Sequence, residues 1–382
     1  MFQSFFSGGF ECSTHRNSQN RRLDIIAATR HDDFAEDDYK RLLKIGMKTA
    51  RDGVRWHLIE HKPYQYDFSS AVNQVRSAEK TGIQIVWDLF HYGYPDDLDI
   101  FSDEFPVRFA GFAEAFTKFL LNENREIPFI CPVNEISFFG WAAGDVGAFY
   151  PFVRGRGDEM KRQLVRATIL AIDKIHKICP AARFVQADPA IHVTVSPTKL
   201  QFKQNAENFR QAQFHALDML IGKRAPELGG AEKYLDIIGV NFYSQNQWRH
   251  PSGRRVLREH KHYRPFSRIL QEWFERYNRP IFIAETGIED DLRPDWFRYI
   301  GEETRLAASN GVPIVGICLY PIVNHPGWNN NRHCYNGLWD YPNSSGRREI
   351  YAPLAEEIIR QQAEQNIFET HKAQNEIAKV VV

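Results

Sequence analysis

The strongest constraint on the fold is an alternation of two kinds of segment. Eight short runs rich in apolar and β-branched residues recur along the chain. They cover residues 5–12, 49–56, 83–90, 129–135, 183–189, 235–243, 281–287 and 314–322. Helix-period segments such as "SAVNQVRSAEKTG" and "MKRQLVRATILAIDKIHKI" separate them. Strands that alternate with helices predict parallel βαβ units, and continuous apolar strands fit a parallel sheet covered on its outside.

Eight such units predict a single-domain (β/α)8 barrel, an α/β fold. A doubly wound sheet is the competing arrangement, but no Gly-x-Gly-x-x-Gly follows the first run. We assign residues 1–365 to the barrel and residues 366–382 to a helical or frayed C-terminal tail. Gly46 and Gly82 stand where C-caps would end two of the predicted helices.

Composition narrows the class of protein. The 382 residues include 48 basic and 48 acidic side chains, so there is no electrostatic reason to expect nucleic acid or an anionic membrane as the partner. Nothing approaches a membrane span of about twenty apolar residues, and the N-terminus lacks a signal-peptide pattern. Five widely spaced cysteines without a Cys-x-x-Cys pattern indicate reduced thiols in a cytoplasmic protein.

Polar side chains recur where the predicted strands end. They are Glu11, Arg55, Trp56, His91, Asn134, Glu135, Asn241, Tyr243, Glu285 and Tyr320. The carboxyl ends of barrel strands meet at one mouth, where barrels carry their active sites. Any one of these residues, taken alone, can be a structural group whose polar atoms are hydrogen-bonded within the fold. Together they predict a site.

Two carboxylates, Glu135 and Glu285, end the runs "FICPVNE" and "IFIAE". Glycoside hydrolysis uses such a pair, with one group protonating the leaving oxygen. A separation of about 5–5.5 Å makes the other a nucleophile, and about 6.5–9.5 Å leaves room for water. Arg55 is expected to keep the nucleophile ionised, while a neighbouring anion raises the pKa of the acid.

These segments resemble the retaining β-glycosidases of glycoside hydrolase clan A, and particularly family 1, the β-glucosidase and 6-phospho-β-glucosidase group. "PVNEI" is similar to the family's Asn-Glu-Pro acid/base motif, and "IFIAETG" to its Thr-Glu-Asn-Gly nucleophile motif. "LFHYGYPDDL" is similar to its His-Trp-Asp-Leu-Pro segment, "GVRW" to the second-strand arginine segment and "GVNFY" to the sixth-strand tyrosine segment. "YPIVNHPGW" has the spacing of its Trp-Ser…Asn-Phe-Glu-Trp segment. The resemblance spans roughly residues 5–345.

The resemblance implies a retaining, exo-acting β-glycosidase that binds a carbohydrate substrate and needs no cofactor or metal. Glu285 would be the nucleophile and Glu135 the acid and base. The supporting contacts implied are Asn134 to the 2-hydroxyl, His91 and Glu11 to outer hydroxyls, Tyr243 to Glu285, and Tyr320, Trp328 and Trp339 as the sugar platform.

Three positions depart from the family pattern. Tyr320 stands where the family has tryptophan, Gly327 where it has glutamate, and Glu11 where it has glutamine. Plain glucoside specificity therefore does not carry over, and a divergent relative is the better description. The clan has a cis bond after the strand-eight tryptophan, and an X-Pro bond adopts cis at low cost. Tyr320–Pro321 is therefore predicted to be cis.

Two loops have two interpretations each. The basic loop 249–264 either contacts an acidic group of the substrate or is solvated. The aromatic loop 138–152 either forms a wall of the site or packs against the barrel rim. A non-catalytic sugar-binding or scaffold barrel and a transglycosidase with the same covalent intermediate are the alternative functions. A catalytic metal is disfavoured, because the first strand has no His-x-His and His260 and His262 lie in the basic loop. The sequence does not define the sugar, the linkage or the oligomeric state.

Overall fold

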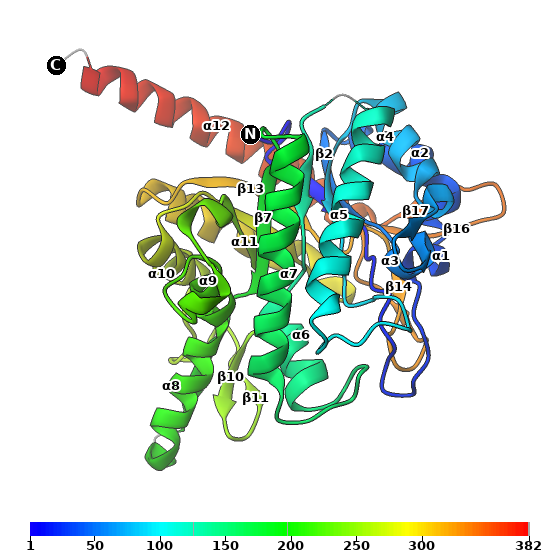
Figure 1. The fold of residues 1–382 in the computed structure, drawn as a ribbon. Helices are drawn as coiled ribbons and strands as arrows, with labels where there is room; N and C mark the ends of the chain where they lie inside the picture. The colour runs from blue at the N-terminus through cyan, green and yellow to red at the C-terminus, as the bar shows by residue number, and fades with distance from the viewer. Residues whose placement is uncertain (125, 197, 381–382) are drawn as a thin grey trace.

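Eight parallel strands close into a barrel in the computed structural model, which describes residues 1–124, 126–196 and 198–380 (Figure 1). In barrel order they are β1 (Phe6–Gly9), β2 (Thr49–Gly53), β5 (Gln84–Asp88), β6 (Phe129–Cys131), β7 (Arg183–Pro189), β9 (Ile237–Asn241), β12 (Ile281–Thr286) and β13 (Ile314–Leu319). β13 closes the barrel on β1, with Phe6 opposite Ile317. The predicted (β/α)8 fold is confirmed.

Helices between the strands form the outer layer. The longer ones are α2 (His31–Lys44), α4 (Val72–Thr81), α5 (Glu104–Glu123), α7 (Gly157–Ile178), α10 (Phe266–Tyr277), α11 (Arg293–Ser309) and α12 (Ala352–Val380), with α8 (Lys203–Gln211) and α9 (His215–Leu220) after β7. Short helices in the loops are α1 (Ile25–Ala28), α3 (Trp56–Ile59) and α6 (Ile136–Phe139). Gly82 ends α4 at φ +71°, as its sequence position predicts.

Small sheets decorate the loops. β8 (His192–Val195), β10 (Gln247–His250) and β11 (Arg254–Arg255) form one sheet, and the pairs β3 (Glu60–Lys62) with β4 (Gln65–Tyr66), β14 (His325–Pro326) with β15 (His333–Cys334), and β16 (Trp339–Pro342) with β17 (Arg348–Ile350) form others. After β17, α12 continues without a break past residue 366 and projects from the barrel (Figure 1). Among the described residues, no helix is both long and apolar enough to cross a membrane.

Aromatic packing fills the barrel at the end where its strands begin. The rings of Phe129 on β6 and Phe282 on β12 lie 5.3 and 4.6 Å from that of Phe2. A second core lies between strands and helices, where Trp56 packs on the α5 rings of Phe109 and Phe112. Because apolar side chains fill this end, the polar residues collect at the opposite, carboxyl end of the strands.

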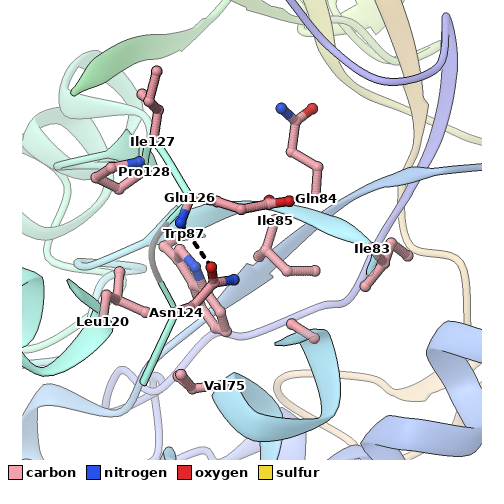
Figure 2. Close-up of a pocket in the computed structure, with 11 residues that line it drawn as sticks. Val75, Ile83, Gln84, Ile85, Trp87, Leu120, Asn124, Glu126, Ile127 and Pro128 are labelled. Carbon is pink, nitrogen blue, oxygen red and sulfur yellow. Dashed lines mark hydrogen bonds between the residues drawn. The ribbon is translucent and has the colours of Figure 1, made fainter. Parts of the chain in front are cut away.

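A hollow of about 30 Å³ lies beside the barrel, near the starts of β5 and β6 (Figure 2). Ile85 and Trp87 of β5 and Leu120 of α5 line it, and Asn124 there accepts a hydrogen bond from the backbone N–H of Glu126 at 2.7 Å. Such a volume holds about one or two water molecules. It is far too small for a sugar and lies away from the barrel mouth.

Candidate active site

The carboxyl ends of the strands bring the two predicted carboxylates into one buried network. Glu135 follows β6 and is 8% exposed, and Glu285 lies near the end of β12 and is 5% exposed. Burying a charged group is costly unless it is paired and hydrogen-bonded. The partners of each carboxylate therefore decide what it can do.

Arg51, on β2, is the cation of the site. Its Nη1 donates to Glu285 Oε1 at 2.8 Å, and its Nη2 donates to Asn134 Oδ1 at 2.7 Å. Its Nε donates to Asp88 Oδ1 at 3.1 Å. One buried guanidinium thus joins residues from β5, β12 and the turn after β6.

The expectation that Arg55 holds the nucleophile is wrong. Arg55 donates to Asp32 Oδ2 at 2.6 Å, to Asp24 Oδ2 at 3.2 Å and to the Ser70 carbonyl at 2.7 Å. Arg51 and Arg55 are four residues apart, so an extended strand would point both to the same face. However, β2 ends at Gly53, and Arg55 lies in the turn that begins α3.

Glu285 is held on both oxygens. Tyr243 Oη donates to Oε2 at 2.8 Å, as the family resemblance implies, and Arg51 occupies Oε1. Burial raises the pKa of Glu285, whereas the Arg51 charge and the Tyr243 hydroxyl favour its ionised form. Of the two carboxylates, this one has a direct cationic partner.

Asn134 orders the centre of the site. A guanidinium can only donate, so the contact with Arg51 fixes Oδ1 as the acceptor and Nδ2 as the donor. Nδ2 lies 3.1 Å from His91 Nε2 and donates to Tyr92 Oη at 3.2 Å. His91 Nε2 is therefore an acceptor, and its Nδ1 carries the proton toward Asp88 Oδ2 at 3.1 Å. Both amide hydrogens of Asn134 have protein partners.

Glu135 has only neutral donors. Its backbone is left-handed at φ +50°, and its N–H donates to the Ala187 carbonyl at 2.9 Å. Asn241 Nδ2 donates to Oε1 at 2.9 Å, and the Tyr92 hydroxyl donates to Oε2. Burial and then repulsion from Glu285 raise the pKa of Glu135 to about 8, despite these two donors.

Glu11 reaches the same site from the segment after β1. Its Oε1 accepts from the backbone N–H of Ser13 at 3.0 Å and from the Ser13 hydroxyl. The same oxygen lies 4.0 Å from His91 Nε2. Glu11 and His91, which the resemblance pairs as contacts to outer hydroxyls, are thus neighbours.

Cys12, Asp88 and His91 form a cluster that could ligate a metal ion by proximity. Cys12 Sγ lies 3.2 Å from His91 Nδ1 and 3.7 Å from Asp88 Oδ2. However, Arg51 Nη2 lies 2.8 Å from Asp88 Oδ2, and burial together with Asp88 raises the pKa of the Cys12 thiol well above its usual range. Because the Arg51 cation already lies against Asp88, the cluster is better described as a hydrogen-bond network than as a metal site.

The three predicted platform residues have different surroundings. Tyr320 lies in the site, parallel to His91 with ring centroids 6.1 Å apart, and its bond to Pro321 is cis as predicted. Trp328 packs on Tyr92 with centroids 6.1 Å apart. Trp339, on β16, is 5% exposed, forms a β-bridge with Val323 and belongs to the same apolar cluster as Tyr92, so its place in the sugar platform stays a prediction.

Sequence reasoning missed three members of the network. Arg51 and Asp88 lie inside predicted strands and read as core positions, although a charged residue within an apolar run is itself a signal. Tyr92 is adjacent to His91, and its role depends on a left-handed backbone at φ +69° that the sequence does not display. Asn241 was recognised as a strand end but had no assigned role.

The fold is similar to solved structures of a β-glucosidase from Thermotoga maritima. A structure described as a family 1 β-glucosidase has a TM-score of 0.76 at 14% identity, covering 95% of this chain and 98% of that one. The glucoimidazole complex gives 0.75 at 14% over 94% and 98%, and the castanospermine complex 0.74 at 15% over 94% and 97%. No family model and no curated protein matches this sequence. At such low identity the likeness establishes a glucosidase-like barrel fold, and activity must be argued from the site.

Proposed function

We propose that the protein is a retaining β-glycosidase and a divergent relative of glycoside hydrolase family 1. The observation that carries this proposal is the difference between two buried carboxylates. Glu285 accepts from a guanidinium and a phenol, whereas Glu135 accepts only from neutral donors and has a pKa raised to about 8. Two carboxyl groups whose environments separate their protonation states are what an acid and a nucleophile require.

In the first step, Glu285 Oε attacks the anomeric carbon while Glu135 transfers its proton to the glycosidic oxygen. The aglycone leaves as an alcohol, and the sugar stays on Glu285 as an ester. In the second step, ionised Glu135 takes a proton from water, whose oxygen attacks the anomeric carbon and releases Glu285. A sugar hydroxyl in place of water would give transglycosylation.

The remaining predicted residues would bind the sugar. Glu11 and His91 would contact outer hydroxyls, and Tyr320, Trp328 and Trp339 would shape the platform. Asn134 was expected to bond the 2-hydroxyl, but both of its amide hydrogens are committed to His91 and Tyr92. A 2-hydroxyl could bind there only if one of these contacts were exchanged.

Covalent trapping tests the proposal. A panel of 2-deoxy-2-fluoro glycosyl fluorides with different sugar configurations should label Glu285, and mass spectrometry of the digested protein should locate the sugar on that residue. Glu285→Gln should prevent labelling and abolish turnover of activated aryl glycosides. Absence of labelling and turnover across the panel, with sugars still binding by calorimetry, would favour the sugar-binding scaffold instead.

A further inference from the structure

Tyr92 connects the two residues of the Asn134–Glu135 pair. Its Oη accepts from Asn134 Nδ2 at 3.2 Å, and its hydroxyl donates to Glu135 Oε2. The side chain is 2% exposed. The proposed catalytic cycle does not assign it a role.

Arg51 stands at one end of this series of hydrogen bonds and fixes the direction of each of them. Arg51 only donates, so Asn134 must present Oδ1 to Arg51 and Nδ2 to Tyr92. The phenol oxygen accepts that amide hydrogen. Its single hydrogen is then free to point at the carboxylate, where it stabilises negative charge.

The ring of Tyr92 is held in place on several sides. It stacks on Phe139 at a centroid distance of 5.5 Å and 15°, and it also contacts Phe149 and Trp328. The backbone φ of +69° is uncommon for a residue with a side chain. At the next position, Gly93, a Cβ would overlap Thr14. The turn therefore fixes the hydroxyl instead of letting it swing.

We infer that Tyr92 is a positioning residue for the acid/base Glu135, an inference that rests on the proposed function. The donated hydrogen favours the ionised carboxylate, which the second step of the proposed cycle requires. It opposes the burial and the repulsion from Glu285 that favour the protonated form in the first step. Tyr92 thus lets one carboxyl group serve as acid and then as base near neutral pH.

Tyr92→Phe removes this donor and leaves the ring. Losing a hydrogen bond to a charged group should raise the pKa of Glu135 by about one unit. The alkaline limb of kcat/KM should therefore move to higher pH by about one unit. With a dinitrophenyl glycoside, for which the second step limits kcat, the acidic limb of the kcat profile should also move to higher pH by about one unit, and kcat on that limb should fall by up to about tenfold.

Tyr94→Phe is the matched control. Tyr94 is in the same turn and is as deeply buried, but its hydroxyl has no hydrogen-bond partner among the described residues. This variant should leave the pH profile and kcat unchanged. A second measurement does not need turnover. Infrared titration of the Glu135 carboxyl stretch gives the pKa of that group in the wild type and in both Tyr→Phe variants, and Glu135→Gln assigns the band.

The outcomes separate the two proposals. A shifted infrared titration in an enzyme that hydrolyses no glycoside would support the Tyr92–Glu135 coupling and overturn the proposed function. An active enzyme whose Glu135 titration and kcat/KM limb are the same in Tyr92→Phe would overturn the inference alone. A lower KM with an unshifted limb would also overturn it, because Tyr92 would then merely obstruct the sugar.

Discussion

Arg51 and Glu285 are 234 residues apart in sequence, yet Arg51 Nη1 lies 2.8 Å from Glu285 Oε1 across the barrel mouth. The arginine is fully buried and also neutralises Asp88. Removing one partner of a buried ion pair leaves an uncompensated charge, which typically costs about 3–5 kcal/mol. Stability and the proposed catalysis therefore depend on the same side chain.

Arg51→Lys should abolish most activity, because a single ammonium cannot donate to Glu285, Asn134 and Asp88 in the planar arrangement of a guanidinium. We expect kcat/KM to fall by about 10³-fold. Arg55→Lys is the matched variant, since Arg55 serves Asp24 and Asp32 instead. It should lose less than about tenfold in kcat/KM. Equal losses would mean that Arg51 is no more important for catalysis than Arg55.

The fold followed from the sequence because hydrophobic periodicity and helix–strand alternation are local signals. The eight predicted runs each contain one barrel strand. The two glutamates were also identifiable as a candidate pair, because both end apolar runs whose carboxyl ends meet at one barrel mouth. The predictions of the fold and of the two glutamates needed only the types of the residues and their spacing.

The contacts inside the site did not follow from the sequence. Arg51 and Arg55 would point to the same face if the whole predicted run were a strand, and only the end of β2 at Gly53 distinguishes them. Tyr92 and Glu135 meet through left-handed residues on two separate turns, and non-glycine residues give no clear sign of that conformation in advance.

The pH dependence of activity should report Glu135. Because its pKa is about 8 and the first step needs its proton, kcat/KM for a glycoside with a poor leaving group should fall as the pH rises through about 8. The decrease in kcat/KM should be much smaller for a dinitrophenyl glycoside, because dinitrophenolate leaves without taking up a proton. Profiles between pH 5 and 10 would check this, and an identical limb for both substrates would assign it to another group.

The same pKa predicts how stability varies with pH. The carboxyl pKa of Glu135 is ordinarily 4.5 and about 8 in the fold, so the folded protein holds this proton more tightly. Its contribution to stability is complete below about pH 4.5 and is lost progressively as the pH rises to about 8. Glu135→Gln cannot ionise, so it should gain up to about 4 kcal/mol relative to wild type between pH 4.5 and 8.5. Urea unfolding at those two pH values measures the difference, and a pH-independent difference would contradict it.

Asp188 should matter through the turn that carries Glu135. Its Oδ1 accepts from the Ser137 N–H at 3.0 Å and its Oδ2 from the Ser137 hydroxyl at 2.7 Å. Asp188→Ala leaves both donors unsatisfied, which should destabilise the fold by about 1–3 kcal/mol. It should also lower kcat/KM by about tenfold as Glu135 loses its fixed position. Ser137→Ala removes only one bond and should have a smaller effect on both. Full activity in Asp188→Ala would show that the turn does not need this anchor.

Zinc provides a test of the cluster formed by Cys12, Asp88 and His91. Arg51 Nη2 already lies 2.8 Å from Asp88 Oδ2, and burial keeps the Cys12 thiol protonated. A divalent ion would have to displace a buried cation and a proton, so ZnCl2 should not raise the melting temperature, and dialysis against a chelator should not reduce activity. Thermal unfolding with and without ZnCl2, in wild type and in Cys12→Ser, measures this. A zinc-dependent rise in Tm that disappears in Cys12→Ser would establish the cluster as a metal site.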